Sequence, residues 1–267
     1  MDHLKAGYDL DAEGFILSEA AIGKISVAYW PCIRETINRL TDLFPDLLHS
    51  VYVYGSVARG DAVIPTSDSD LIALFRRKLG PGQSAQLKQL SDDQSASHRS
   101  LVREVGMAMA DYDTTLDPSN YFENAFLREM SVCVYGEDLG ERFGPYKLTP
   151  EIAIQFNGDI CESLRRTLRK LEAASDGKAT RIVQGFARKL IRTFYSMTMA
   201  RSQIWTTRLN EQAVVAARYF PDRAAVVRTL LDWSEYGPPA DRSAFAELFR
   251  QQGGWACSNF GKEARIT

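Results

Sequence analysis

Apolar residues recur at helical spacing near the start of the chain and again through its second half. Isoleucine, leucine and alanine return every three or four positions up to Pro45, which predicts a helix over 17–44. From Thr149 onward all the apolar stripes have this spacing, which predicts an antiparallel helical bundle. Its later helices are expected at 209–219 and 222–234.

The middle of the chain carries the short β-branched and aromatic runs that are typical of strands. The sequence predicts strands at 51–54, 70–75, 102–112 and 132–136, and helices at about 57–59, 84–101 and 119–130. A mixed segment followed by a purely helical one indicates two domains. We place them at residues 1–145 and 146–267, with the boundary near Gly144 and Pro145.

Composition limits the partners that the chain is expected to have. Its 32 Lys and Arg residues nearly balance 34 Asp and Glu residues, for a net charge of −2, so nucleic acid is not favoured as a partner. No stretch reaches the roughly 20 apolar residues of a membrane span, and no signal peptide is recognised. Because the four cysteines lie far apart without metal-binding spacing, we expect reduced thiols in a cytoplasmic protein.

The chemistry is concentrated where the first predicted strand ends. A strand that stops at Gly55 and Ser56 and runs into a helix presents backbone N–H groups at a helix N-terminus, where phosphate binds favourably. Arg59 follows within one turn and offers a charge-assisted bond to a phosphate oxygen. A Gly-Ser pair by itself more often marks an ordinary turn.

Two acids stand at the start of the second predicted strand. Asp68 and Asp70 are two residues apart, so in an extended chain their side chains share one face. Two carboxylates at such a short distance repel each other unless a cation lies between them. Mg²⁺ is commonly held by one or two carboxylates together with substrate phosphates. Such a pair alone is more often a solvated loop or a helix cap. Together with the Gly-Ser turn, it predicts a magnesium and triphosphate site.

Over about residues 50–75, this combination resembles the signature of the DNA polymerase β superfamily of nucleotidyltransferases, and most closely the aminoglycoside adenylyltransferases. The resemblance implies the α+β fold class, with a mixed-sheet nucleotidyltransferase domain followed by an all-α helical bundle. It implies transfer of AMP from ATP to a hydroxyl of a small molecule such as an aminoglycoside antibiotic, with release of pyrophosphate. It further implies that Asp68 and Asp70 bind two Mg²⁺ ions and that Ser67 belongs to the nucleotide site.

The same resemblance implies a third carboxylate on a later strand, as a metal ligand or as general base. The candidates are Glu104, Asp111 and Asp113. Glu104 is preferred because, as in the adenylyltransferases, it opens an apolar run. If residues 84–105 form one long helix instead, Asp111 takes this role.

Basic residues of the helical half complete the prediction. Lys189 and Arg192 lie away from the apolar stripe of their helix, which usually means a solvated face. The resemblance implies that they contact the triphosphate. Two alternative functions stay open, which are transfer to a protein or tRNA, as in toxin–antitoxin nucleotidyltransferases, and nucleotide binding without catalysis.

Overall fold

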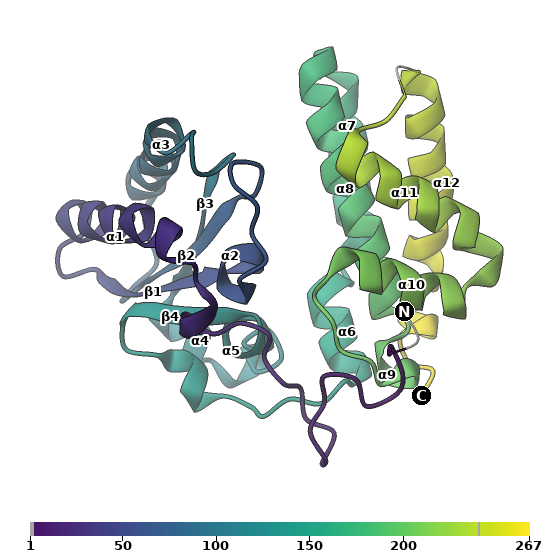
Figure 1. Ribbon diagram of the computed structural model, residues 1–267, viewed down its shortest axis with the longest axis horizontal. Coiled ribbons are helices and arrows are strands. Elements are labelled where there is room, and N and C mark those ends of the chain that lie inside the picture. The colour runs from purple at the N-terminus through teal and green to yellow at the C-terminus, as the bar shows by residue number, and fades with distance from the viewer. Residues whose placement is uncertain (1–2, 240) are drawn as a thin grey trace. The chain divides into compact units, whose positions relative to one another are not determined.

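The computed structural model describes residues 3–239 and 241–267. The chain divides into two compact units, drawn in Figure 1. The sheet unit is Ser18–Pro145, and the helical unit combines residues 3–17 with Tyr146–Thr267. None of the described helices is long and apolar enough to cross a membrane.

A four-stranded mixed sheet forms the centre of the sheet unit. Its strands are β1 (Leu48–Tyr54), β2 (Ser69–Phe75), β3 (Val105–Asp111) and β4 (Ser131–Gly136). The order across the sheet is β3-β2-β1-β4. β1 runs antiparallel to both β2 and β4, whereas β2 and β3 are parallel. The parallel pair matters for function because it brings the starts of β2 and β3 to the same edge of the sheet.

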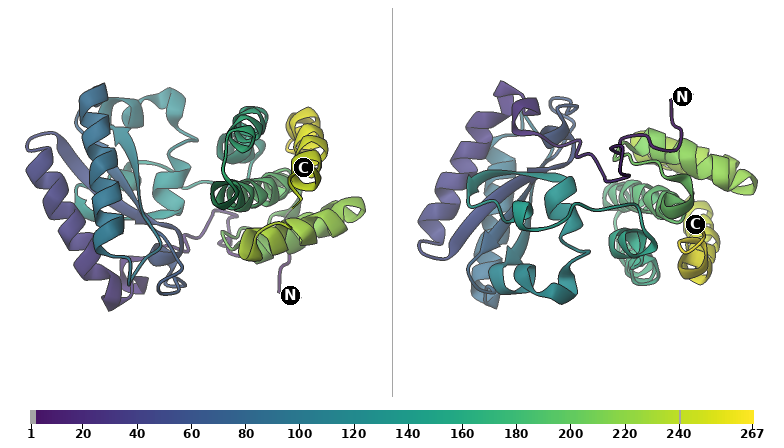
Figure 2. Two further views of the ribbon diagram at one scale, coloured as in Figure 1. Left: turned by 90° about the horizontal axis from the view of Figure 1, so that it is seen from above. Right: turned by 90° about the horizontal axis from the view of Figure 1, so that it is seen from below.

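Helices cover both faces of this sheet. On one face, α1 (Trp30–Leu43) and α3 (Pro81–Ser97) lie side by side and share a core with Leu71 and Phe75 of β2 (Figure 2). The short helix α2 (Gly55–Arg59) joins this core through Val57 and Ala58. On the other face, Ile72 packs with residues of α4 (Tyr112–Leu116), α5 (Ala125–Glu129) and the 3₁₀ turn η4 (Leu139–Arg142). The 3₁₀ turn η3 (Pro118–Asn120) follows α4 in the chain. Alternate residues of β2 therefore enter two separate cores, as a strand buried on both faces requires.

The helical unit is organised around α8 (Asp176–Ser196), which packs against most of the other long helices of the unit. The other helices are α6 (Pro150–Asn157), α7 (Ile160–Glu172), α9 (Met199–Ser202), α10 (Leu209–Tyr219), α11 (Ala224–Tyr236) and α12 (Arg242–Glu263), with the 3₁₀ turn η5 (Pro221–Arg223) before α11. The stripe from Val183 to Met197 is buried against α7, α10, α11 and α12. The predicted α+β fold class, a mixed sheet followed by an all-α bundle, is confirmed.

The beginning of the chain differs from the prediction. Only Trp30–Leu43 of the expected helix over 17–44 is α-helical, and two 3₁₀ turns, η1 (Ile22–Lys24) and η2 (Val27–Tyr29), precede it. Ser26 accepts a hydrogen bond from the N–H of Ala28, so a local side-chain bond interrupts the helix there.

Residues 3–17, which the sequence assigned to the first domain, belong to the helical unit. Leu4 is fully buried, the Gly7 N–H donates to the carbonyl of Gln203, and the Trp205 N–H donates to the carbonyl of Tyr8. These contacts attach a segment without helical or strand periodicity to the bundle. The sheet unit ends at Pro145.

Several further expectations need correction. The expected helix over 119–130 is split into η3 and α5, because the side-chain amides of Asn120 and Asn124 bond to the carbonyls of Thr114 and Thr115 instead of continuing a helix. The strand expected at 102–112 begins only at Val105.

The expectation of four reduced thiols is wrong, because Cys161 of α7 and Cys257 of α12 form a disulfide. The two cysteines are 96 residues apart in sequence, and their Cα atoms are 5.0 Å apart. Cys32 and Cys133 are free.

Candidate active site

The predicted acids meet at the edge of the sheet where β2 and β3 begin. Asp70 of β2 lies opposite Gly106 of β3, and Ser69 lies opposite Val105. Asp68 and Glu104 each stand one residue earlier, and the Ser69 N–H donates to the Glu104 carbonyl at 2.9 Å.

Residues opposite each other on neighbouring strands project to the same face. The register therefore puts Asp70 on the same face as Gly106, with Asp68 and Glu104 at the positions just before the two paired strands. Among residues 3–239 and 241–267, no three acidic, histidine or cysteine side chains are already gathered as a metal-binding group. The site thus presents an aspartate pair, with Glu104 exposed beside it.

Two glycines make room for the carboxylate of Asp70. A Cβ atom on Gly106 would lie 2.7 Å from Asp70 Oδ1, and one on Gly55 would lie 3.1 Å from Asp70 Oδ2. Gly55 also has a positive φ of 72°, a conformation that glycine adopts without steric penalty. Asp70 therefore occupies a cradle that any larger residue at either position would fill. Sequence reasoning missed Gly106, although a glycine inside a strand is a known sign of close approach.

The Gly-Ser turn has the predicted local structure. β1 ends at Tyr54 and α2 begins at Gly55, which places Ser56 in the first helical turn. Backbone N–H groups in a first turn have no partner within their helix. Gly60 ends α2 in a left-handed conformation and donates its N–H to the carbonyls of Ser56 and Val57. A short strand-to-helix turn thus lies directly beside Asp70.

Two further residues that were predicted to contact phosphate, Arg59 and Ser67, form bonds with residues close to them in the chain. Arg59 forms a two-point ion pair with Asp61, with Nε to Oδ2 at 3.1 Å and Nη2 to Oδ1 at 3.2 Å. The hydroxyl of Ser67 accepts a hydrogen bond from the Val63 N–H at 2.8 Å and stabilises the loop before β2. Each side chain keeps a donor outside these bonds, the O–H of Ser67 and the remaining guanidinium N–H groups of Arg59.

The alternative third acids lie elsewhere in the sheet unit. Asp111 is the last residue of β3 and pairs in register with Phe75, at the opposite end of β2 from Asp70. Its Oδ1 caps α4 by accepting from the Thr114 N–H at 3.0 Å. Asp113 lies in the first turn of α4. Glu104 is thus the candidate beside the aspartate pair.

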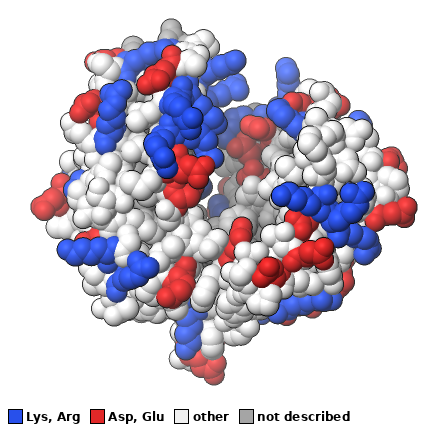
Figure 3. Space-filling model, turned by 180° about the vertical axis from the view of Figure 1, so that it is seen from behind, with Lys and Arg blue, Asp and Glu red and all other residues white. Residues whose placement is uncertain are grey.

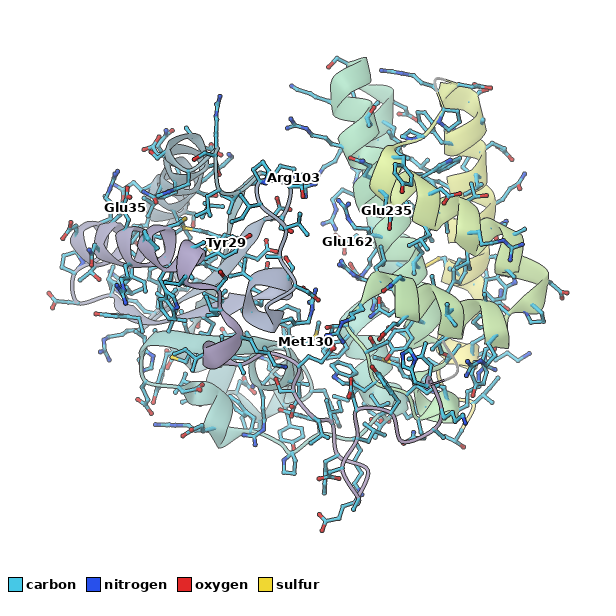
Figure 4. All side chains as sticks on the ribbon, in the orientation of Figure 1. Tyr29, Glu35, Arg103, Met130, Glu162 and Glu235 are labelled. Atoms are coloured by element: carbon cyan, nitrogen blue, oxygen red, sulfur yellow. A yellow bond between two sulfur atoms is a disulfide. The ribbon has the colours of Figure 1, made fainter. Side chains whose placement is uncertain are left out.

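Arg103 is a site residue that sequence reasoning missed. The side chain of Arg103, labelled in Figure 4, donates from Nε to Asp68 Oδ1 at 2.9 Å and from Nη2 to Asp68 Oδ2. The hydrogen bond to Asp68 raises the pKa of Arg103, burial opposes this rise, and the charges of Asp68, Glu104 and Asp70 add to it. A basic residue directly before the chosen acid was the available sequence signal.

A cavity of about 390 Å³ opens on the face of the sheet that carries Asp70. Ile72 and Ala108 alternate in register with Asp70 and Gly106, which places this wall next to the acids. The full lining is Tyr54, Ile72, Ala108, Met109, Ala110, Asp111, Thr114, Thr115, Asn120, Glu123, Asn124, Phe126 and Leu127. It contains two acids and neither lysine nor arginine. The rings of Tyr54 and Phe126 meet edge to face at 5.2 Å.

The predicted basic contacts lie on α8 in the helical unit. Lys189 donates from Nζ to Asn157 Oδ1 at 3.0 Å and also to the carboxylate of Asp159. Burial raises the pKa of Asp159, but hydrogen bonds from Lys189 and Ser163 outweigh it and leave that pKa lowered. Arg192 is exposed.

The fold, a mixed four-stranded sheet followed by a helical bundle, has a solved counterpart. The structure is similar to that of the spectinomycin adenyltransferase AAD(9) from Enterococcus faecialis, solved with ATP and spectinomycin. The two share 12% sequence identity and a TM-score of 0.53, over 85% of this chain and 98% of that one. No family model and no curated protein matches the sequence. The likeness establishes the fold.

Proposed function

We propose that the chain is a magnesium-dependent nucleotidyltransferase that transfers AMP from ATP to a hydroxyl of a small-molecule acceptor such as an aminoglycoside. The observation that carries this proposal is the carboxylate of Asp70, which lies between Gly55 and Gly106 beside Asp68. A strand-to-helix turn of the kind that binds phosphate stands at the same position. The neighbouring fold supports it, because that protein is named an adenyltransferase and its structure contains ATP.

The donor set fits magnesium. Mg²⁺ prefers oxygen ligands and is usually held by one or two carboxylates plus substrate phosphates, so the pair of Asp68 and Asp70 suffices without a preformed cage. When bound, two Mg²⁺ ions would neutralise charge on the leaving pyrophosphate. Room around Asp70 is limited by the glycine cradle, which favours one orientation of its carboxylate.

The protein's own groups have distinct tasks in this reaction. The N–H groups and hydroxyl at Gly55 and Ser56 bind phosphate oxygens, and Arg59 and Ser67 add contacts through donors that their local bonds do not use. The acceptor oxygen bonds to the α-phosphorus, the bond from that phosphorus to the bridging oxygen breaks, and pyrophosphate leaves. Glu104 takes the proton of the acceptor hydroxyl.

The cavity beside the acids supports a small acceptor. Its volume of about 390 Å³ lies within the range of small-molecule sites. Asp111 and Glu123 give its lining a negative charge, and the rings of Tyr54 and Phe126 give it an apolar wall. An amine-bearing cyclic alcohol satisfies both features, and an aminoglycoside belongs to that class.

The test is release of pyrophosphate from ATP and Mg²⁺ over a panel of aminoglycosides. Asp68→Asn and Asp70→Asn should each lower acceptor-dependent release by at least about 100-fold, because each removes a charged metal ligand from the transition state. Circular dichroism should show an unchanged fold, since both carboxylates lie at the sheet edge. A fully active double variant would contradict the proposal.

The competing function is nucleotide binding without transfer. One observation favours it, namely that Arg103 holds Asp68 in an ion pair. The same assay separates the two functions, because a sensor binds ATP but releases no pyrophosphate with any acceptor. A protein-labelling control with labelled ATP detects transfer to a protein instead.

Lys189 and Arg192 remain proposed ligands of the triphosphate. In the helical unit, the ammonium of Lys189 donates to Asp159 and Asn157, which leaves its third N–H to donate to a phosphate oxygen.

A further inference from the structure

The ion pair of Arg103 with Asp68 is built into the backbone at the edge of the sheet. The Arg103 N–H donates to the carbonyl of Ser67 at 3.0 Å, and the Ser69 N–H donates to the carbonyl of Glu104 at 2.9 Å. These two bonds fix the segment that carries Arg103 against the segment that carries Asp68. The pairing of the two side chains is therefore a consequence of the parallel register and is not a chance contact on the surface.

The contact is stronger than an ordinary surface ion pair. The guanidinium meets both carboxylate oxygens, which is the two-point geometry that arginine forms best. The side chain of Asp68 is only 26% exposed, whereas that of Arg103 is 49% exposed. The carboxylate of Asp68 is thus partly shielded from water, whereas the side chain of Arg103 is more exposed to it.

The guanidinium of Arg103 contacts the carboxylate of Asp68, which is also a proposed ligand of the metal. Three acidic side chains lie near this guanidinium, and acids that approach one another repel unless positive charge lies among them. Arg103 supplies that charge through Asp68, and Glu104 and Asp70 also lie close enough to act on it electrostatically. A divalent cation that bound Asp68 would have to displace the guanidinium.

We propose that Arg103 is a positioning residue that occupies Asp68 in the absence of nucleotide, so that a divalent metal binds the acid pair tightly only together with a triphosphate. This inference rests on the proposed function. Arg103 leaves Asp68 at little energetic penalty when phosphate oxygens arrive, because phosphate accepts the same two-point bonds from guanidinium. Without a triphosphate, Arg103 has no replacement partner and competes with the metal.

The test is binding of Mn²⁺ without nucleotide, measured by electron paramagnetic resonance on the full chain. Arg103→Gln should bind Mn²⁺ up to about fivefold more tightly than the parent protein, which is the most that an ion pair of this exposure is expected to contribute. Arg103→Lys, which keeps the charge but loses the two-point geometry, should fall between them. Arg99→Gln is the matched control, because exposed Arg99 carries the same charge four residues away.

A second readout separates competition from a structural role. In the presence of ATP, Arg103→Gln should raise the KM for ATP, because the substitution removes a phosphate contact. If Arg103 had a purely structural role, its substitution would not strengthen Mn²⁺ binding. High salt should reduce the difference in Mn²⁺ affinity between the parent protein and Arg103→Gln, because salt screens the attraction between the partly exposed charges of Arg103 and Asp68.

Equal or weaker Mn²⁺ binding by Arg103→Gln would overturn this inference. If that variant fails to fold, Arg103→Lys decides, and an unchanged Mn²⁺ affinity in it has the same meaning. Either result leaves the proposed function intact as long as Asp70→Asn abolishes pyrophosphate release. If Asp68→Asn and Asp70→Asn leave both Mn²⁺ binding and turnover unchanged, the proposed function fails as well.

Discussion

Gly106 affects the geometry of the site because it has no Cβ atom. Its missing Cβ leaves space for the carboxylate of Asp70, which Gly55 borders on the other side. The atom nearest to an added Cβ would be Asp70 Oδ1, which is at the end of a flexible side chain. A substitution at Gly106 should therefore turn this carboxylate without disturbing the strand. Such a change tests the geometry of the site separately from its charge.

Gly106→Ala should lower turnover by about 100-fold, because a displacement of about 1 Å in a positioned group has that effect. The melting temperature should change little. The matched control is Gly82→Ala, because a Cβ on Gly82 would meet nothing within 4 Å. Equal turnover by Gly106→Ala and the parent protein would show that the orientation of Asp70 does not limit the reaction.

The sequence predicts some of these residues and not others. Asp68 and Asp70 are identified by their spacing and by the turn before them, and Glu104 follows from the apolar run after it. Gly106 and Arg103 act through contacts across β2 and β3, and those contacts depend on register. Register is set by packing over the whole sheet, so a linear pattern does not determine it.

At the scale of elements, prediction succeeded where side-chain periodicity was strong. The strands at 51–54 and 70–75 fall within β1 and β2, and the stripe on α8 is buried as expected. Helix α12 was missed, since Gly253 and Gly254 interrupt its pattern. A Cβ on Gly253 would lie 2.8 Å from Leu164 Cδ1, so the glycine allows α12 to approach α7 closely.

The disulfide between Cys161 and Cys257 joins the same two helices. Closing a loop of this length restricts the unfolded chain, so Cys161→Ser should lower the free energy of unfolding by about 2–4 kcal/mol without reductant. Chemical denaturation monitored by circular dichroism measures this. With dithiothreitol present, the variant and the parent protein should unfold alike.

Cys133→Ser is the control for that experiment, because Cys133 is a free thiol in the sheet unit. Alkylation of all four cysteines in unreduced, denatured parent protein would contradict the disulfide. The cytoplasmic location remains a prediction, and disulfides are more frequent in oxidising compartments.

At the scale of the whole molecule, charge is distributed without a dominant sign. On the face drawn in Figure 3, basic side chains form several groups with acidic side chains beside them, and the chain as a whole has a net charge of −2. A protein that binds nucleic acid chiefly through phosphates usually carries a surplus of basic residues. This balance of charge is the reason for proposing a small-molecule acceptor in preference to tRNA.

The division into units was only partly predictable. The change from strands to helices near Pro145 is visible in the sequence, whereas residues 3–17 join the helical unit through a few specific contacts. Leu4, in a segment with no periodic pattern, is buried by tertiary packing alone.

The most direct measurement is a crystal structure of the protein with Mn²⁺ and a non-hydrolysable ATP analogue, in which anomalous scattering locates the metal. The account predicts a peak at coordination distance from carboxylate oxygens of Asp68 and Asp70 and from the triphosphate, with the phosphates at Gly55 and Ser56 and Arg103 released from Asp68. Nucleotide bound away from this edge of the sheet, with Asp68 still paired to Arg103 and Asp70 free of metal, would contradict it.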